Sequence, residues 1–410
     1  MKTLVFSPQY REEERRDSLR LTNYIRAHGV ECFCSFFDSD IAAAINSGAI
    51  SGADIPLLSR LSLALDIYNM YNSDCIVGIL NGKDEGVLVK LGIAFILGIP
   101  VYLYKYDVRS CFVSGENSMV LGLSKIKPIA DAKKLIKQIL HGKKNADKVA
   151  CDSLSAVIKE LLELGGEVAA CIKEKFSLSA ITERFKETKA LTRFAPAEST
   201  GFAPNGGKVY CSGPLFSPDE HREMLAIAQT FEQRGIGAYL PQRDGAEPYV
   251  LGSMAGPLAG ALITRPFVNK INKIVFAVDV KELLECDYFI CNLNGRYYDE
   301  GAMVEAGMAF AAGKPVTFFL NDQRGIFGSV IHTVLNAISA KPQCAADTET
   351  LFLHMSSAAK AYSVDKNTKR IAPNAEKIAA MGARYYRIIS RLKCPRNKML
   401  EWLEDYDEKQ

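Results

Sequence analysis

Two stretches of sequence decide the fold: DCIVGILNGKDEGVLVKLGIAFILGIPVYLY at residues 74–104 and DYFICNLNGRYYDEGAMVEAGMAFAAGKPVTFF at residues 287–319. Both contain an Asp, an apolar run, LNG, DEG, an apolar helical stretch, a Gly-x-Pro turn and a second apolar run. Gly98 and Gly313 mark the helix ends, and the prolines that follow prevent further helix. Each stretch therefore predicts a βαβ unit with buried parallel strands.

The similarity extends toward the amino end of each stretch. Residues 3–29, TLVFSPQYREEERRDSLRLTNYIRAHG, and residues 208–235, KVYCSGPLFSPDEHREMLAIAQTFEQRG, both read as a short strand, a polar turn and a long charged helix. A fixed internal repeat of this kind indicates duplication of whole domains. The sequence predicts an α/β protein with two tandem flavodoxin/Rossmann-like parallel-sheet domains, residues 1–127 and 208–345, that form a pseudo-dimer.

The remaining segments predict appended helices. Residues 128–193 alternate Lys and Glu with Leu, Ile and Val at helical spacing, which indicates two or three amphipathic helices. Residues 194–207 are rich in Pro, Gly and small side chains and read as a linker. The predicted division is therefore a helical insertion and linker at 128–207 and C-terminal helices at 346–410. These helices could pack the two copies against each other.

Charge and hydropathy exclude several classes of partner. The formal charge of +3 comes from 50 basic and 47 acidic residues mixed along the chain, so no basic face is available for nucleic acid. The apolar run at 87–104 is interrupted by Lys90, glycines and Pro100, which argues against a membrane span. The N-terminus becomes charged after a few apolar residues and does not resemble a secretion signal, so a cytoplasmic location is expected.

The sequence also lacks the usual signals of a metal or cofactor. The eleven cysteines are expected to be reduced thiols, and Cys32 and Cys34 alternate with aromatic residues as in a buried strand. No His/Cys cluster has metal-ligand spacing, and no P-loop or dinucleotide fingerprint is present. We expect neither a metal nor a cofactor.

Glu305 is the main candidate for chemistry. It lies in the apolar stretch AMVEAGMAF, just after a strand end, where ligands bind in open parallel sheets. A carboxylate there is either buried and paired or directed into a cleft. A solvent-facing helix residue is the alternative interpretation, but the flanking Val304 and Ala306 provide no polar stripe. Further acids nearby favour a site in which carboxylates divide the roles of nucleophile and acid.

At these positions the second copy resembles the nucleoside 2-deoxyribosyltransferase family. The resemblance spans about residues 208–335 clearly and 1–125 weakly. It rests on two motifs at the right separation: Tyr210, Gly213, Pro214, Leu215 and Phe216, then Asp299, Gly301, Glu305 and Gly307. It implies an enzyme of nucleotide salvage, a pentosyltransferase acting on a small-molecule nucleoside and a free nucleobase.

The resemblance also implies roles for individual residues. Glu305 would attack C1′ of a 2′-deoxynucleoside to give a covalent deoxyribosyl-enzyme, as in retaining glycosyl transfer. Tyr210 would orient Glu305, although a core strand aromatic is the alternative. Asp279 would handle the base and its proton, and Asp299 would bind sugar hydroxyls unless it is only a turn residue. The other substrate-binding candidates are Gly213, Phe216, Gln242 and Asp244.

The first copy departs from this pattern. Lys90 replaces Glu305 and Phe6 is aligned with Tyr210, while Asp66 and Asp84 are retained. The first copy should therefore be inactive.

Related proteins complete each site with an Asn-x-Met or Ser-x-Met segment of a neighbouring subunit. The first copy carries Asn117-Ser118-Met119, whereas the second offers only Ser329. We expect one composite site in an internal pseudo-dimer, with Asn117 and Met119 supplied by the first half; an ordinary loop role for Asn117 is the alternative. Further assembly into a homo-oligomer is open.

Three functions stay open from sequence. The first is transfer of 2-deoxyribose between nucleobases. The second is hydrolysis of a nucleoside or its 5′-phosphate through the same intermediate, with Ser212, Ser217 and Arg222 as candidate phosphate contacts. The third is a non-catalytic nucleoside or nucleotide sensor.

Overall fold

The computed structural model describes residues 1–39, 41, 55–107, 116–142, 147–186, 207–246, 265–295, 297–322, 332–341, 344–361 and 371–391. In these residues every cysteine is a free thiol. None of the helices they form has the length and apolar character needed to cross a membrane.

The chain builds two parallel four-stranded sheets of the same strand order. The first contains β1 (Lys2–Phe6), β2 (Glu31–Cys34), β3 (Cys75–Ile79) and β4 (Val101–Tyr104), in the order β2-β1-β3-β4. The second contains β5 (Lys208–Ser212), β6 (Gly237–Tyr239), β7 (Tyr288–Asn292) and β8 (Val316–Phe319), in the order β6-β5-β7-β8. Every residue of β3 and β7 is buried, as expected for central strands covered on both faces. The predicted α/β class is confirmed.

Helices connect and cover the strands. In the first half they are α1 (Glu12–Ala27), α3 (Ile55–Tyr71), α4 (Glu85–Ile96) and α5 (Ser118–Gly122). In the second half they are α10 (Pro218–Glu232), α11 (Pro241–Asp244), α14 (Arg265–Glu285), α15 (Glu300–Ala311) and α17 (Thr333–Ile338). Asp84 and Asp299 cap the amino ends of α4 and α15, and Gly98 and Gly313 follow their carboxyl ends with left-handed φ angles of 74° and 75°.

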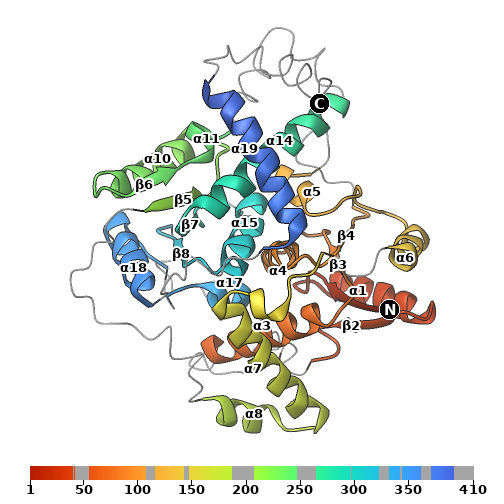
Figure 1. The fold of residues 1–410 in the computed structure, drawn as a ribbon. Helices are drawn as coiled ribbons and strands as arrows, with labels where there is room; N and C mark the ends of the chain where they lie inside the picture. Colours follow the sequence, from red (N-terminus) through yellow and green to blue (C-terminus); the bar gives the residue numbers. More distant parts are fainter. Residues whose placement is uncertain are drawn as a thin grey trace.

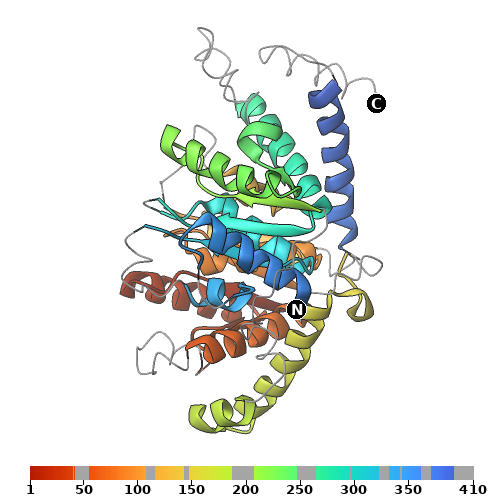
Figure 2. The same ribbon diagram turned by 90° about the vertical axis from the view of Figure 1, so that its left-hand side faces the viewer.

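The predicted helices outside the two sheet units are present. Between the halves lie α6 (Ala132–His141), the short 3₁₀ helix η1 (Cys151–Ser153), α7 (Ala156–Lys173) and α8 (Leu178–Phe185). After β8 and α17 come α18 (Thr348–Ala361) and α19 (Pro373–Arg391). Figures 1 and 2 show α8 and α19 toward opposite ends of the molecule. Of the predicted linker at 194–207, only residue 207 lies within the described residues.

Several contacts recur at equivalent places in the two halves. The backbone N–H of Lys2 donates to Asp74 at 2.8 Å, and that of Lys208 donates to Asp287 at 3.0 Å. Asp287 thus fixes the entry to the two neighbouring strands β5 and β7. The side chain of Asn81 accepts from the backbone N–H of Tyr106, and Asn294 accepts likewise from Asn321.

The strand register corrects one sequence alignment. Thr3 pairs with Cys75 and Val209 pairs with Tyr288, each one residue after the equivalent Asp. Leu4 is therefore the counterpart of Tyr210, and Phe6 is the counterpart of Ser212. The prediction that Phe6 replaces Tyr210 was wrong. It aligned two aromatic residues, whereas the backbone positions align Leu4 with Tyr210.

The two halves pack through α4 and α15, which lie side by side between the sheets (Figure 1). A Cβ atom added to Gly92 would lie 2.2 Å from the carbonyl oxygen of Val304, and one added to Gly307 would lie 2.0 Å from that of Val89. The contact is reciprocal, as in an isologous interface. One apolar core joins residues of both halves across it.

Candidate active site

The carboxylate of Glu305 is buried and held by two hydroxyl groups. Its side chain, on the second turn of α15, is 5% exposed. Tyr210 Oη donates to Oε1 at 2.8 Å, and Ser212 Oγ donates to Oε2 at 2.5 Å. The predicted contact between Tyr210 and Glu305 is therefore present. Both carboxylate oxygens are fixed, which holds the group in one orientation.

Strand geometry explains why these two hydroxyls meet one carboxylate. Side chains two residues apart on a strand point to the same face, so Tyr210 and Ser212 both face α15. The alternate residues Val209 and Cys211 pack into a separate apolar cluster with α10. The Tyr210 ring also stacks on Phe289 with centroids 5.6 Å apart.

Asp279 lies on α14 and is connected to Glu305 through two tyrosines. Its side chain is 2% exposed and accepts a hydrogen bond of 3.0 Å from Tyr239 Oη. The rings of Tyr239 and Tyr210 are 5.1 Å apart. The sequence identified Asp279 but not Tyr239, whose position at the end of β6 was the available signal.

Asp299 begins α15 and has a shifted pKa. Its Oδ1 accepts from the backbone N–H of Ala302 at 2.8 Å. Loss of surrounding water is the largest cause of a pKa raised to about 6, and it outweighs the opposing backbone hydrogen bond. The neighbouring Glu300 raises the pKa further. This carboxyl group therefore changes charge within the range in which many enzymes work.

Burial also keeps a nearby thiol neutral. The pKa of Cys291 on β7 is raised well above its usual value, first by burial and then by the charges of Glu305 and Asp299. A neutral thiol is a poor nucleophile. Of these neighbouring groups, the carboxylates are the ones suited to attack an electrophilic carbon.

Two exposed aromatic residues flank the carboxyl ends of β5 and β7. Phe216 is 70% exposed and Tyr297 is 74% exposed. The loops that carry them are adjacent, because a Cβ atom on Gly295 would lie 3.8 Å from Pro214. Gly213 is enclosed, and a Cβ atom there would lie 2.7 Å from Asn292. Exposed aromatic faces are suited to stacking on a planar base.

The loop after β6 carries the other two predicted base contacts. Gln242 Nε2 donates to the carbonyl oxygen of His221, while its buried Oε1 accepts no hydrogen bond from the described residues. Asp244 accepts from the backbone N–H of Leu240 and pairs with Arg243 at 2.8 Å. No hydrogen bond within the described part of the chain joins either residue to Glu305.

The first half contributes Asn117 to the surroundings of Asp299. A Cβ atom on Gly301 would lie 3.0 Å from Asn117 Nδ2 and 3.1 Å from Asp299 Oδ1. Asn117 Oδ1 also accepts from the backbone N–H of Met119, which caps α5. Met119 is 3% exposed and packs in the core, so its side chain has a structural position.

The second half makes the reciprocal contribution through His332. His332 Nδ1 accepts from the backbone N–H of Val334, as Asn117 accepts from Met119. A Cβ atom on Gly86 would lie 2.2 Å from the His332 ring. His332, which the sequence comparison missed, therefore takes the place of Asn117. Ser329 lies outside the described residues.

The pocket of the first half is small, about 80 Å³, and its lining contains an ion pair. Lys90 Nζ lies 3.3 Å from an oxygen of Asp66 and 4.4 Å from the centre of the Phe6 ring. Ser35 donates to the other oxygen of Asp66. The position equivalent to Glu305 thus carries an ammonium group paired with the counterpart of Asp279.

One cluster has side chains of the kinds that bind metals. Potential ligand atoms of Asp84, Glu85 and His332 lie within 4.8 Å of one another. Because His332 Nδ1 accepts a backbone hydrogen bond, its proton must be on Nε2. Nε2 then donates and cannot ligate a cation. Asp84 is in addition occupied as the cap of α4. The group does not fit a metal site.

The comparisons with known proteins assign the second half. Residues 209–355 match the family model for nucleoside 2-deoxyribosyltransferase. The matched region runs from β5 to α18, and it includes Tyr210, Asp279 and Glu305. The match confirms that residues 209–355 resemble this family, as their motifs predict. No match to the chain was found among curated proteins.

Proposed function

We propose that this protein exchanges nucleobases on 2′-deoxyribose through a covalent deoxyribosyl–Glu305 intermediate. One observation carries the proposal: a buried carboxylate at the carboxyl end of a parallel sheet, with both oxygens held by Tyr210 and Ser212. A fixed carboxylate is the group that retaining glycosyl transfer requires as nucleophile.

The reaction has two balanced steps. In the first, Glu305 forms a C–O bond to C1′ while the N-glycosidic bond breaks, and its electron pair leaves with the base, which takes up a proton. In the second, a nitrogen of the acceptor base attacks C1′, loses its proton and releases Glu305. Asp279 is our candidate for this proton exchange, and Asp299 for binding a sugar hydroxyl.

Recurring contacts support a duplicated chain that folds as an internal pseudo-dimer. The strand orders of the two sheets are the same. Asn117 of the first half lies beside Gly301 of the second, and His332 of the second half lies beside Gly86 of the first. We propose sheet domains at 1–127 and 208–345 that share one composite active site. Asn117 would complete that site from the first half, because its amide lies against the start of α15.

We propose a single active site, because the first half carries Lys90 in place of the carboxylate of Glu305. Lys90 cannot act as a carboxylate nucleophile, and its Nζ lies 3.3 Å from a carboxylate oxygen of Asp66. We propose that the first half serves as the structural partner of the second.

The contacts of the second half favour nucleosides over their 5′-phosphates. Ser212 is bonded to Glu305, Ser217 caps α10, and Arg222 pairs with Asp219. The candidate phosphate contacts are therefore engaged elsewhere, and acids lie beside them.

Chromatography of reactions with 2′-deoxyinosine, with and without adenine, tests the function. Formation of deoxyadenosine by the wild-type protein but not by Glu305→Gln would support the transferase. Release of hypoxanthine and deoxyribose at the same rate with and without adenine would contradict the transferase and support the hydrolase. Absence of turnover with several bases and 5′-phosphates would contradict both and leave the sensor.

A further inference from the structure

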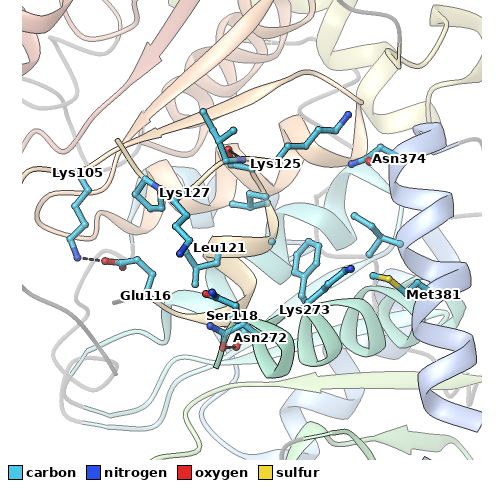
Figure 3. Close-up of a pocket in the computed structure, with 18 of the residues that line it drawn as sticks. Lys105, Glu116, Ser118, Leu121, Lys125, Lys127, Asn272, Lys273, Asn374 and Met381 are labelled. Carbon is cyan, nitrogen blue, oxygen red and sulfur yellow. Dashed lines mark hydrogen bonds and ion pairs between the residues drawn. The ribbon is translucent and has the colours of Figure 1, made fainter. Parts of the chain in front are cut away.

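A cavity of about 700 Å³ lies outside the site described above. It is bounded by α5 and the following residues 123–128 of the first half, and by α14 and α19 of the second (Figure 3). Its size falls within the range of pockets that hold small molecules. Because both halves form its walls, it exists only in their assembled form.

The walls combine an apolar surface with amides. Leu121, Phe276 and Met381 provide apolar contact, and Asn269 and Asn374 can donate to and accept from the edge of a planar ring. An apolar lining with a few polar groups is typical of pockets that bind small molecules.

The cavity lining holds more lysines than carboxylates, and one of the lysines, Lys125, pairs with Asp147 at 3.5 Å. Lys105 is already paired with Glu116, and also with Asp107 at 3.6 Å. No described residue forms an ion pair with Lys127 or Lys273, and Figure 3 shows these lysines on different walls of the cavity. Their charges are available to an anion that enters between them.

We propose that this cavity binds a nucleoside 5′-monophosphate. Lys127 and Lys273 would hold the phosphate, and the base would lie against Phe276 and Met381 with its edge toward the asparagine amides. A free sugar or nucleoside would leave the lysines unused, and inorganic phosphate would leave the apolar wall unused.

A bound nucleotide would be connected to the active site through one wall. Ser118 Oγ donates to Asn272 Oδ1 at 2.8 Å, which ties α5 to α14 beside the cavity. Asn117 precedes Ser118 and reaches Gly301, while Asp279 lies two helical turns beyond Asn272. The cavity is thus placed to regulate the proposed composite site.

Equilibrium dialysis with the full-length protein tests the proposal without relying on turnover. The probes are AMP, GMP, CMP and UMP, with inorganic phosphate as competitor. The variants are Lys127→Gln with Lys273→Gln, Glu305→Gln for the active site, and Lys173→Gln, which removes one exposed charge on α7 away from the cavity.

We expect at least one nucleotide to bind wild-type protein, Glu305→Gln and Lys173→Gln equally. The double lysine variant should bind it roughly tenfold more weakly, and salt should weaken binding to the wild type. Loss of binding in Glu305→Gln with retention in the double variant would place the nucleotide in the active site and overturn the proposal. So would the absence of binding of all four nucleotides at millimolar concentration. Because binding is measured directly, failure of the proposed transfer reaction would leave this result intact.

Discussion

Gly92 lies where α4 of the first half meets α15 of the second, and Gly92→Ala tests how the halves pack. The added Cβ atom would lie 2.2 Å from the carbonyl oxygen of Val304, whereas ordinary contacts begin at 3.4 Å. The two helices must therefore separate by about 1.2 Å at this point, the difference between these two distances. The obstructing atom belongs to backbone, so a change of rotamer cannot relieve the contact.

The expected loss of stability is about 1–2 kcal/mol. Overpacking of a close-packed interior costs about 1–3 kcal/mol, and alanine returns up to about 1 kcal/mol in helix propensity. Activity should also fall, because Val304 precedes Glu305 and misplacement of about 1 Å at a catalytic group costs up to about a hundredfold in rate.

Urea unfolding and the kcat/KM for base exchange measure the two effects. Gly166→Ala on α7 is the matched control, since its Cβ atom would only touch the Tyr68 ring at 3.3 Å. The control should be as stable as the wild type or up to about 1 kcal/mol more stable, because alanine has the higher helix propensity and meets only a side chain. If Gly92→Ala unfolds at the same urea concentration as the wild type and keeps full activity, the glycine-to-backbone packing of the halves is refuted.

Three further predictions concern the site itself. Tyr210→Phe and Ser212→Ala each remove one hydrogen bond to Glu305, and each should lower kcat roughly ten- to a hundredfold; unchanged turnover in both would show that carboxylate orientation is unimportant. Asn117→Ala should lower kcat/KM more than Asn117→Ser does, because serine keeps the cap of α5 and loses only the amide. Wild-type kcat/KM in both variants would contradict the composite site. Because the pKa of Asp299 is raised to about 6, its stabilising effect is present below about pH 4 and is lost as pH rises through 6. Asp299→Asn should therefore resist urea better than the wild type at pH 7.5 but not at pH 4. The decrease of kcat/KM on the acid side of about pH 6, which we expect for the wild type, should also disappear in this variant. If that decrease persists, it belongs to another group.

The sequence by itself determined the repeated units and the identity of the main acids. The apolar runs, the LNG and DEG loops and the Gly-x-Pro turns recur at fixed spacing, and each has a local physical cause in strand burial, helix capping or helix termination. Glu305 was found because a carboxylate in an apolar helix must be paired or functional. The periodicity of residues 128–193 predicted two or three helices, and the described residues of that segment form α6, α7 and α8.

Tertiary structure alone decided which side chains meet. Ser212 and Tyr210 both contact Glu305 because they face α15 from the same strand. The strand pairing shows that Leu4 of the first sheet is the counterpart of Tyr210 in the second. His332 replaces Asn117 at the other cleft although the two segments have little similarity in sequence. Such contacts join residues far apart in the chain, so no local pattern encodes them.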